Sequence, residues 1–143
     1  MSDYIEAHLI LAKGQNAKAL EHVIDTVLSH PNIYVFGEFL ALPVCKELNP
    51  KMLATLELFA YGTYPEYKAS PNQFVSLKPQ QEHKLKLVTL AQMASNSSQC
   101  NYTDLMQATN ISEIRALEDA VIDCFQVGLL KGRLDQKNRK LHV

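Results

Sequence analysis

The sequence predicts a mainly α-helical protein: a helical-repeat bundle of the TPR or HEAT type, followed by a winged helix-turn-helix with a small antiparallel sheet. Apolar residues recur at the helical period through the first half of the chain. From Gln80 onward the pattern runs helix, short strand, helix, helix and hairpin, which is the order of a winged helix. The best linker lies at residues 70–79. We therefore expect a helical bundle over residues 1–75 and a winged-helix subdomain over residues 76–143.

The first half is expected to contain short helices separated by glycine and proline. One helix should end at Gly14, and a second should cover residues 16–29 and stop before Pro31. A short apolar helix is expected at residues 35–42, with a further turn at residues 44–48. We expect these helices to stack in antiparallel pairs as a short solenoid.

The next helix should begin at Pro50, because proline suits the first helical turn, and end at Gly62. Its own residues are apolar on almost every face, so this helix is expected to be the central, buried helix of this half. We interpret Tyr61, Gly62, Thr63 and Tyr64 as a helix end with aromatic rings packed onto it, not as a binding site. A short helical segment should follow from Tyr64.

The linker at residues 70–79 combines two prolines with apolar residues. Prolines favour an irregular connection. Phe74, Val75 and Leu77 should nevertheless hold this segment against the bundle, so we expect no free hinge.

The second half should open with a helix at residues 80–94, whose apolar residues recur at helical spacing. A polar cluster ends it, and a short strand is expected at residues 100–102. Thr103 is suited to cap the second helix.

The third helix of this half, at about residues 111–127, has the wrong charge for a DNA-recognition helix. Asn110 followed by Glu113 has the form of a capping box at its start. Its charged residues are Glu113, Glu118, Asp119, Asp123 and one cation, Arg115. A helix that enters the major groove normally meets the DNA polyanion with Lys and Arg. The charge therefore favours a protein partner over nucleic acid.

The last residues predict a β-hairpin with one apolar and one basic face. Leu130, Gly132 and Leu134 alternate with charged residues, and Leu141 and Val143 do so on the return strand. The candidate partner-interface residues are Lys131, Arg133, Lys137, Arg139, Lys140 and His142. A basic edge strand can prevent edge-to-edge aggregation, dock a chosen partner or contact phosphates. The acidic third helix favours docking or edge protection.

Composition and spacing argue against several classes of function. The formal net charge is -1 and charged residues make up 20% of the chain, as in an average globular protein. There is no secretory signal and no apolar run long enough for a membrane span, so we expect a protein of the cytoplasm and nucleus with no membrane partner. Cys45, Cys100 and Cys124 are expected to be buried or half-buried thiols.

No residue spacing typical of catalytic or cofactor chemistry occurs. We find no metal-ligand cluster, phosphate-binding glycine loop or nucleophile motif, and the five histidines are scattered. The sequence therefore predicts no catalytic residue, no cofactor, no metal, no small-molecule substrate and no enzymatic activity.

Five segments in order resemble the PCI-domain family, most closely the PCI subunits of the COP9 signalosome. They are HPNIYVFGEFL at residues 30–40, LFAYGTYPEY at 58–67, VTLA at 88–91, RALED at 115–119 with Ile122, and GRLDQKN at 132–138. This family builds the scaffolds of the proteasome lid, the signalosome and a translation initiation factor. Residues 83–88 are a few positions shorter than the family pattern, and the family continues into C-terminal helices beyond the position of Val143.

The resemblance implies a non-catalytic scaffold. In the family, winged helices pack side by side through strand edges, and signalosome subunit four is the expected neighbour. The signalosome removes Nedd8 from cullins and so regulates cullin-RING ubiquitin ligases, with its metalloprotease centre on another subunit. Without the C-terminal helices we expect PCI docking to remain and helical-bundle assembly to be lost. A different PCI scaffold and a nucleic-acid-binding winged helix stay open as alternatives.

Overall fold

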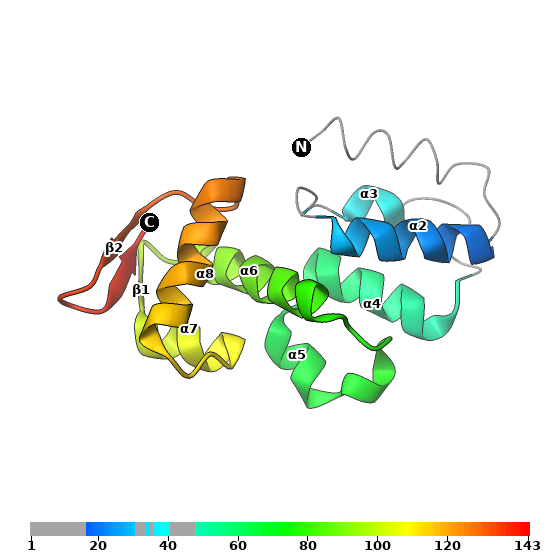
Figure 1. Cartoon of the computed structure of the whole chain (residues 1–143), viewed down its shortest axis with the longest axis horizontal. Helices are drawn as coiled ribbons and strands as arrows, with labels where there is room; N and C mark the ends of the chain where they lie inside the picture. The colour runs from blue at the N-terminus through cyan, green and yellow to red at the C-terminus, as the bar shows by residue number, and fades with distance from the viewer. Residues whose placement is uncertain (1–16, 31–33, 35, 41–47) are drawn as a thin grey trace. The chain divides into compact units, whose positions relative to one another are not determined.

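The computed structural model describes residues 17–30, 34, 36–40 and 48–143 (Figure 1). The chain divides into two compact units, Met1–Lys84 and Leu85–Val143. Helix α6, Pro79–Ser95, contains the point of division. Helices form most of the described residues and three short strands form one antiparallel sheet, so the predicted mainly α fold class is confirmed.

The first unit is built on helices packed around aromatic residues. Its other elements are α2 (Ala17–Ser29), α3 (Gly37–Leu40), α4 (Pro50–Tyr61), α5 (Tyr64–Ala69) and the 3₁₀ helix η2 (Pro71–Gln73). Helix α4 contacts both α2 and α3. The rings of Phe36 and Phe59 meet edge to face with 5.7 Å between their centroids, and Leu20 and Ile24 of α2 are fully buried. The helices expected before Gly14 and at residues 44–48 lie outside the described residues, apart from Leu48.

Helix α4 has the ends that the sequence predicts. The side chain of Asn49 accepts a hydrogen bond from the Lys51 N–H at 2.9 Å, and Pro50 occupies the first helical turn. The Gly62 N–H donates to the Leu58 carbonyl at 2.8 Å and closes the helix. A Cβ at Gly62 would lie 2.8 Å from Leu58 Cδ1 and 3.0 Å from the Leu58 carbonyl oxygen, so a larger residue would require these neighbours to shift.

The expectation that α4 is the central, buried helix of this half is wrong for one of its faces. Leu56 and Phe59 are buried, whereas Glu57 is exposed and Tyr61 is 72% exposed. The helices that contact α4 cover one side of it and leave this stripe open. The predicted packing of aromatic rings at the helix end is therefore confirmed for buried Tyr64 and wrong for Tyr61.

The segment after α5 is held to the first unit, as the sequence predicts. The Phe74 ring lies 5.9 Å from the Tyr67 ring, centroid to centroid. The Val75 N–H donates to the hydroxyl of Thr55, a fully buried residue of α4, at 3.0 Å. A side chain on a helix thus fixes the backbone of the linker.

Lys84 is a buried cation that the sequence pattern did not reveal. Its residue is only 4% exposed, and its Nζ donates to the carbonyls of Val27, at 3.0 Å, and His30. The same Nζ lies 5.1 Å from the centroid of the Tyr34 ring and 5.6 Å from that of Phe36. Burial lowers the pKa of Lys84 to about 7. The ammonium thus adds a second hydrogen bond to the Val27 carbonyl, which also accepts from the His30 N–H at 3.2 Å, and binds the carbonyl of His30, the residue after α2.

The second unit is a winged helix. After α6 come β1 (Gln99–Asn101), α7 (Tyr102–Thr109), α8 (Ile114–Val127), β2 (Arg133–Asp135) and β3 (Lys140–His142). The sheet order is β1-β3-β2 with both pairings antiparallel, so the last strand runs in the middle (Figure 1). Leu105 of α7, Leu117 and Val121 of α8, and Leu141 of β3 are fully buried and form the core.

Two predicted helix caps are wrong. Thr103 lies inside α7, which begins at Tyr102, and the N-cap position belongs to Asn101. Asn110 does not open the third helix but closes α7, in the left-handed conformation with φ 55°. Asparagine tolerates this conformation better than most residues, which favours its use as a helix end. Helix α8 therefore starts at Ile114, with Glu113 at its N-cap and no side-chain cap bond.

None of the helices described is both long and apolar enough to span a membrane.

Candidate docking surface

The hairpin of β2 and β3 has the two faces that the sequence predicts. Its register pairs Arg133 with His142, Leu134 with Leu141 and Asp135 with Lys140. Leu141 is fully buried and Leu134 half-buried, so this pair turns toward the core. Because neighbouring residues on a strand alternate in direction, the other two pairs share the opposite face.

All six candidate interface residues lie on this hairpin or directly beside it. Lys131, Arg133, Lys137 and Arg139 are exposed, whereas Lys140 and His142 are half-buried. Lys137 and Arg139 belong to the turn between the strands. We call these six residues the basic wing.

Asp135 places a hydrogen-bonded carboxylate within the basic wing. Its carboxylate accepts hydrogen bonds from the backbone N–H and the side-chain Nδ2 of Asn138, at 3.1 and 2.9 Å, and lies 3.4 Å from His142 Nε2. The bonds from Asn138, with a smaller contribution from His142, lower the pKa of Asp135. The positive charge available to a partner is therefore that of the exposed Lys131, Arg133, Lys137 and Arg139.

The turn of the wing is anchored by backbone contacts that sequence reasoning missed. Arg139 adopts a left-handed conformation with φ 54°, and its carbonyl accepts a hydrogen bond from the Tyr102 N–H at 2.9 Å. A Cβ at Gly132 would overlap the backbone carbonyl oxygen of His142, so only glycine fits there. The glycine of the GRLDQKN segment is the one local signal for this close approach.

Strand β2 forms an open edge of the sheet. Among the described strands it pairs with β3 alone, so the backbone on its other side has no strand partner. Arg133 lies on this strand and Lys131 two residues before it, and both are exposed. An open edge flanked by cations can accept a strand from another protein while discouraging pairing between identical copies.

Only two of the acidic side chains of the predicted third helix, which is α8 in the structure, are exposed. Glu113 and Asp119 are exposed, whereas Asp123 is half-buried. Half-buried Glu118 accepts a hydrogen bond from the Tyr102 hydroxyl at 2.9 Å. Because Glu118 is bonded inside the unit and Asp123 is half-buried, the exposed negative charge at this helix is that of Glu113 and Asp119.

The described residues contain no cluster of three side chains suited to hold a metal ion. Cys100 is half-buried and Cys124 is buried, as expected, whereas Cys45 lies outside the described residues. Burial, with a smaller contribution from Asp123, raises the pKa of Cys124 to about 12. This thiol is therefore a packing residue and not a reactive nucleophile.

A helical unit followed by a winged helix is the architecture of PCI domains. The model of the PCI domain matches residues 51–143, and that of the CSN7 helical bundle subdomain matches residues 6–37. The chain belongs to the PCI domain family, which confirms the resemblance drawn from its sequence.

Comparison with individual proteins shows which members of the family the chain resembles. The chain is 38% identical to COP9 signalosome complex subunit 7 of Drosophila melanogaster, over 98% of the chain and 52% of that protein. It is 34% identical to the same subunit of Dictyostelium discoideum, over 97% of the chain and 55% of that protein. A more distant relative is eukaryotic translation initiation factor 3 subunit M of Drosophila willistoni, at 29% identity over 84% of the chain and 33% of that protein. The chain spans about half the length of the signalosome subunits it matches.

Proposed function

We propose that this chain is a non-catalytic scaffold subunit of the COP9 signalosome, the assembly that removes Nedd8 from cullins. Its role there is to dock against a neighbouring PCI subunit, with subunit four as the partner, in the cytoplasm and nucleus. The similarity to signalosome subunit 7 over nearly the whole chain supports this assembly.

The observation that carries the docking proposal is the open edge of β2 beside exposed Lys131 and Arg133. A partner strand added at this edge would gain main-chain hydrogen bonds, and complementary acidic residues would set its register and its rate of association. The face of the hairpin that carries Leu134 and Leu141 turns toward the core. Docking therefore uses the edge and the charges of the basic wing.

The test is binding of this chain to purified signalosome subunit four, measured by size exclusion and by titration calorimetry. We expect a stable complex whose dissociation constant rises by about tenfold, or about 1.4 kcal/mol, in the Lys131→Gln/Arg133→Gln variant, because this variant removes two charges that would complement acidic residues of the partner. Lys51→Glu is the matched control. It makes the same change in net charge at an exposed residue of α4 and should bind like the unaltered chain.

Equal binding by the wing variant and the unaltered chain would refute the wing as the interface while leaving assembly with subunit four intact. Absence of a complex with subunit four would refute that partner.

One alternative has an observation in its favour. The similarity to initiation factor 3 subunit M supports a PCI scaffold of the translation machinery. Affinity purification of the tagged chain separates the two assemblies, because the signalosome proposal expects signalosome subunits and the alternative expects initiation-factor subunits.

A further inference from the structure

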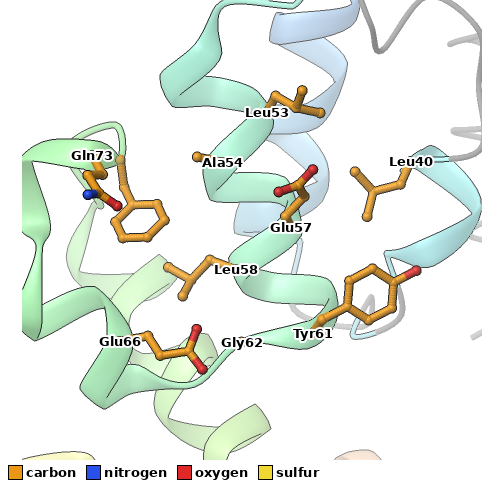
Figure 2. A pocket seen from close by; sticks show the side chains of 10 residues that line it. Leu40, Leu53, Ala54, Glu57, Leu58, Tyr61, Gly62, Glu66 and Gln73 are labelled. Atoms are coloured by element: carbon orange, nitrogen blue, oxygen red, sulfur yellow. The ribbon is translucent and has the colours of Figure 1, made fainter.

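An open hollow in the first unit lies over the exposed face of α4. Its volume is about 710 Å³, and all its lining residues belong to the first unit. Figure 2 shows α4 running along the hollow. The side chains of Leu40 and Tyr61 lie on one side of the helix, and those of Leu58, Glu66 and Gln73 lie on the other. The basic wing lies in the second unit and contributes nothing to this surface.

The lining is largely apolar and includes an exposed aromatic ring. Leu40, Leu53, Ala54 and Phe74 are half-buried, and each contributes apolar surface to the hollow. Tyr61 is 72% exposed, more than any other large hydrophobic residue among those described. Exposed tyrosine beside an apolar hollow is typical of residues that contribute strongly to protein–protein binding.

The charged side chains among the described lining residues of the hollow are all negative. Glu57 and Glu66 are the charged residues of the lining, and no Lys, Arg or His lies among the described lining residues. Within the part of the chain that the structure describes, neither carboxylate forms an ion pair or a side-chain hydrogen bond. An apolar surface laid over these two carboxylates would remove their hydration without replacing it, so a partner that covers them must supply cations.

We propose that this hollow, which we call the α4 groove, binds an amphipathic helix of a partner protein, one that carries an apolar stripe flanked by Lys or Arg. The α4 residues in the lining run from Leu53 to Tyr61. At a rise of about 1.5 Å per residue this is a stretch of about 12 Å, or roughly two helical turns. An apolar stripe of similar length on a second helix can lie along it.

Two other occupants fit the α4 groove less well, one because of its charge and the other because it offers little apolar surface. An acidic segment would add repulsion to the desolvation of Glu57 and Glu66. The basic wing of a second copy would bring cations but little apolar surface, because Leu141 is fully buried and Leu134 half-buried in its own unit.

The probe is a fluorescein-labelled helical peptide of about 18 residues, or five turns, with leucine at i, i+3, i+4 and i+7 and lysine elsewhere. Two matched peptides keep its length: one carries glutamate in place of lysine, and the other has the same composition with the leucines dispersed. Binding to the full chain is followed by fluorescence anisotropy. Changes in the backbone amide chemical shifts, measured by NMR, then locate the bound peptide. We expect the lysine peptide to bind, with shifts at Leu53, Ala54 and Tyr61, and both other peptides to bind at least about tenfold more weakly.

Substitutions at the lining residues show which side chains bind the peptide. Tyr61→Ala should weaken the lysine peptide about tenfold without changing the unfolding midpoint, because its side chain is exposed. Glu57→Gln/Glu66→Gln should remove the preference for lysine, and Glu57→Lys/Glu66→Lys should reverse it in favour of the glutamate peptide. Glu113→Gln/Asp119→Asn is the control, with the same change in net charge on exposed residues of the second unit.

Several results would overturn the proposal. These are no binding of the lysine peptide at millimolar concentration, equal binding of the three peptides, or an equal loss in the control variant. Self-association of the free chain that Tyr61→Ala abolishes would make a second copy the occupant. Lys131→Gln/Arg133→Gln should leave peptide binding unchanged, so failure of wing docking and failure of the α4 groove can be told apart.

Discussion

Lys84 shows how one side chain can support the end of a helix that lies far away in the sequence. Its Nζ donates to the carbonyls of Val27 and His30 and lies over the ring of Tyr34. A neutral amine keeps two N–H donors, so both hydrogen bonds can survive deprotonation. The contact therefore persists while the charge of Lys84 titrates.

This titration predicts a stability that rises with pH just above neutrality. The folded-state pKa of Lys84 is about 7 against an ordinary value of 10.5, so between these values the unfolded chain binds more protons than the folded chain. The free energy of unfolding should increase by up to about 1.4 kcal/mol per pH unit in this window. Above pH 9 the raised pKa of Cys124, about 12 against 9.0, has the opposite effect, because the unfolded thiol loses its proton first.

Urea unfolding between pH 7 and pH 9 measures this slope. Lys84→Met should abolish the rise. Lys51→Met, which removes an exposed lysine of α4, should retain it. The same rise in Lys84→Met would show that another group titrates.

At the scale of the element, one hydroxyl group on α4 holds the segment between α5 and α6 in place. Thr55 Oγ1 donates to the Lys51 carbonyl at 2.7 Å and accepts from the Val75 N–H at 3.0 Å. The first bond lies within α4, whereas the second joins α4 to the segment. A backbone N–H that loses its partner in a partly buried place costs roughly 1–3 kcal/mol.

Thr55→Val keeps the shape of the side chain and removes this acceptor. We expect a loss of about 1–2 kcal/mol in the free energy of unfolding and faster hydrogen exchange at the Val75 amide. Thr109→Val is the matched control, because Thr109 is equally buried and its hydroxyl bonds the Leu105 carbonyl of its own helix. Unchanged exchange at Val75 in the Thr55 variant would mean that the apolar contacts of Phe74 and Val75 hold the segment by themselves.

The elements themselves could be predicted well from the sequence, and their junctions less well. Pro50 was informative because proline fixes its own backbone, and Gly62 because a Cβ at that position would crowd Leu58. Asn110 was misassigned because asparagine suits both the start of a helix and a left-handed end, and only the α7 carbonyls that close that turn distinguish them. Local pattern cannot decide between two uses of one residue.

At the scale of the whole molecule, the candidate surfaces differ in how far sequence could reveal them. The basic wing was visible because Lys131 and Arg133 alternate with apolar residues along a strand. The α4 groove was not visible, because α4 is apolar almost all round and the sequence gives no sign of which face its neighbours leave open. Only packing distinguishes exposed Tyr61 from buried Phe59 two residues earlier.

The distribution of charge over the second unit predicts how the chain responds to DNA. The basic wing offers exposed cations, but α8 adds the exposed carboxylates of Glu113 and Asp119. The net charge of the whole chain is -1, so no general attraction compensates for their repulsion. We expect no binding to random duplex DNA at a physiological ionic strength of about 0.15 M.

Glu113→Lys/Asp119→Lys should convert this unit into a weak DNA binder. Its affinity should be at least about tenfold above that of the unaltered chain at low salt, and log K should fall with log salt at a slope of about −0.9 for each phosphate contacted. Glu57→Lys/Glu66→Lys, which changes the net charge equally within the first unit, should gain less. Fluorescence anisotropy with a labelled duplex at several salt concentrations separates these cases.

Binding by the unaltered chain at physiological salt, with a slope that Lys131→Gln/Arg133→Gln reduces, would instead make the wing a phosphate-binding element. Family membership would then describe the fold but not the partner.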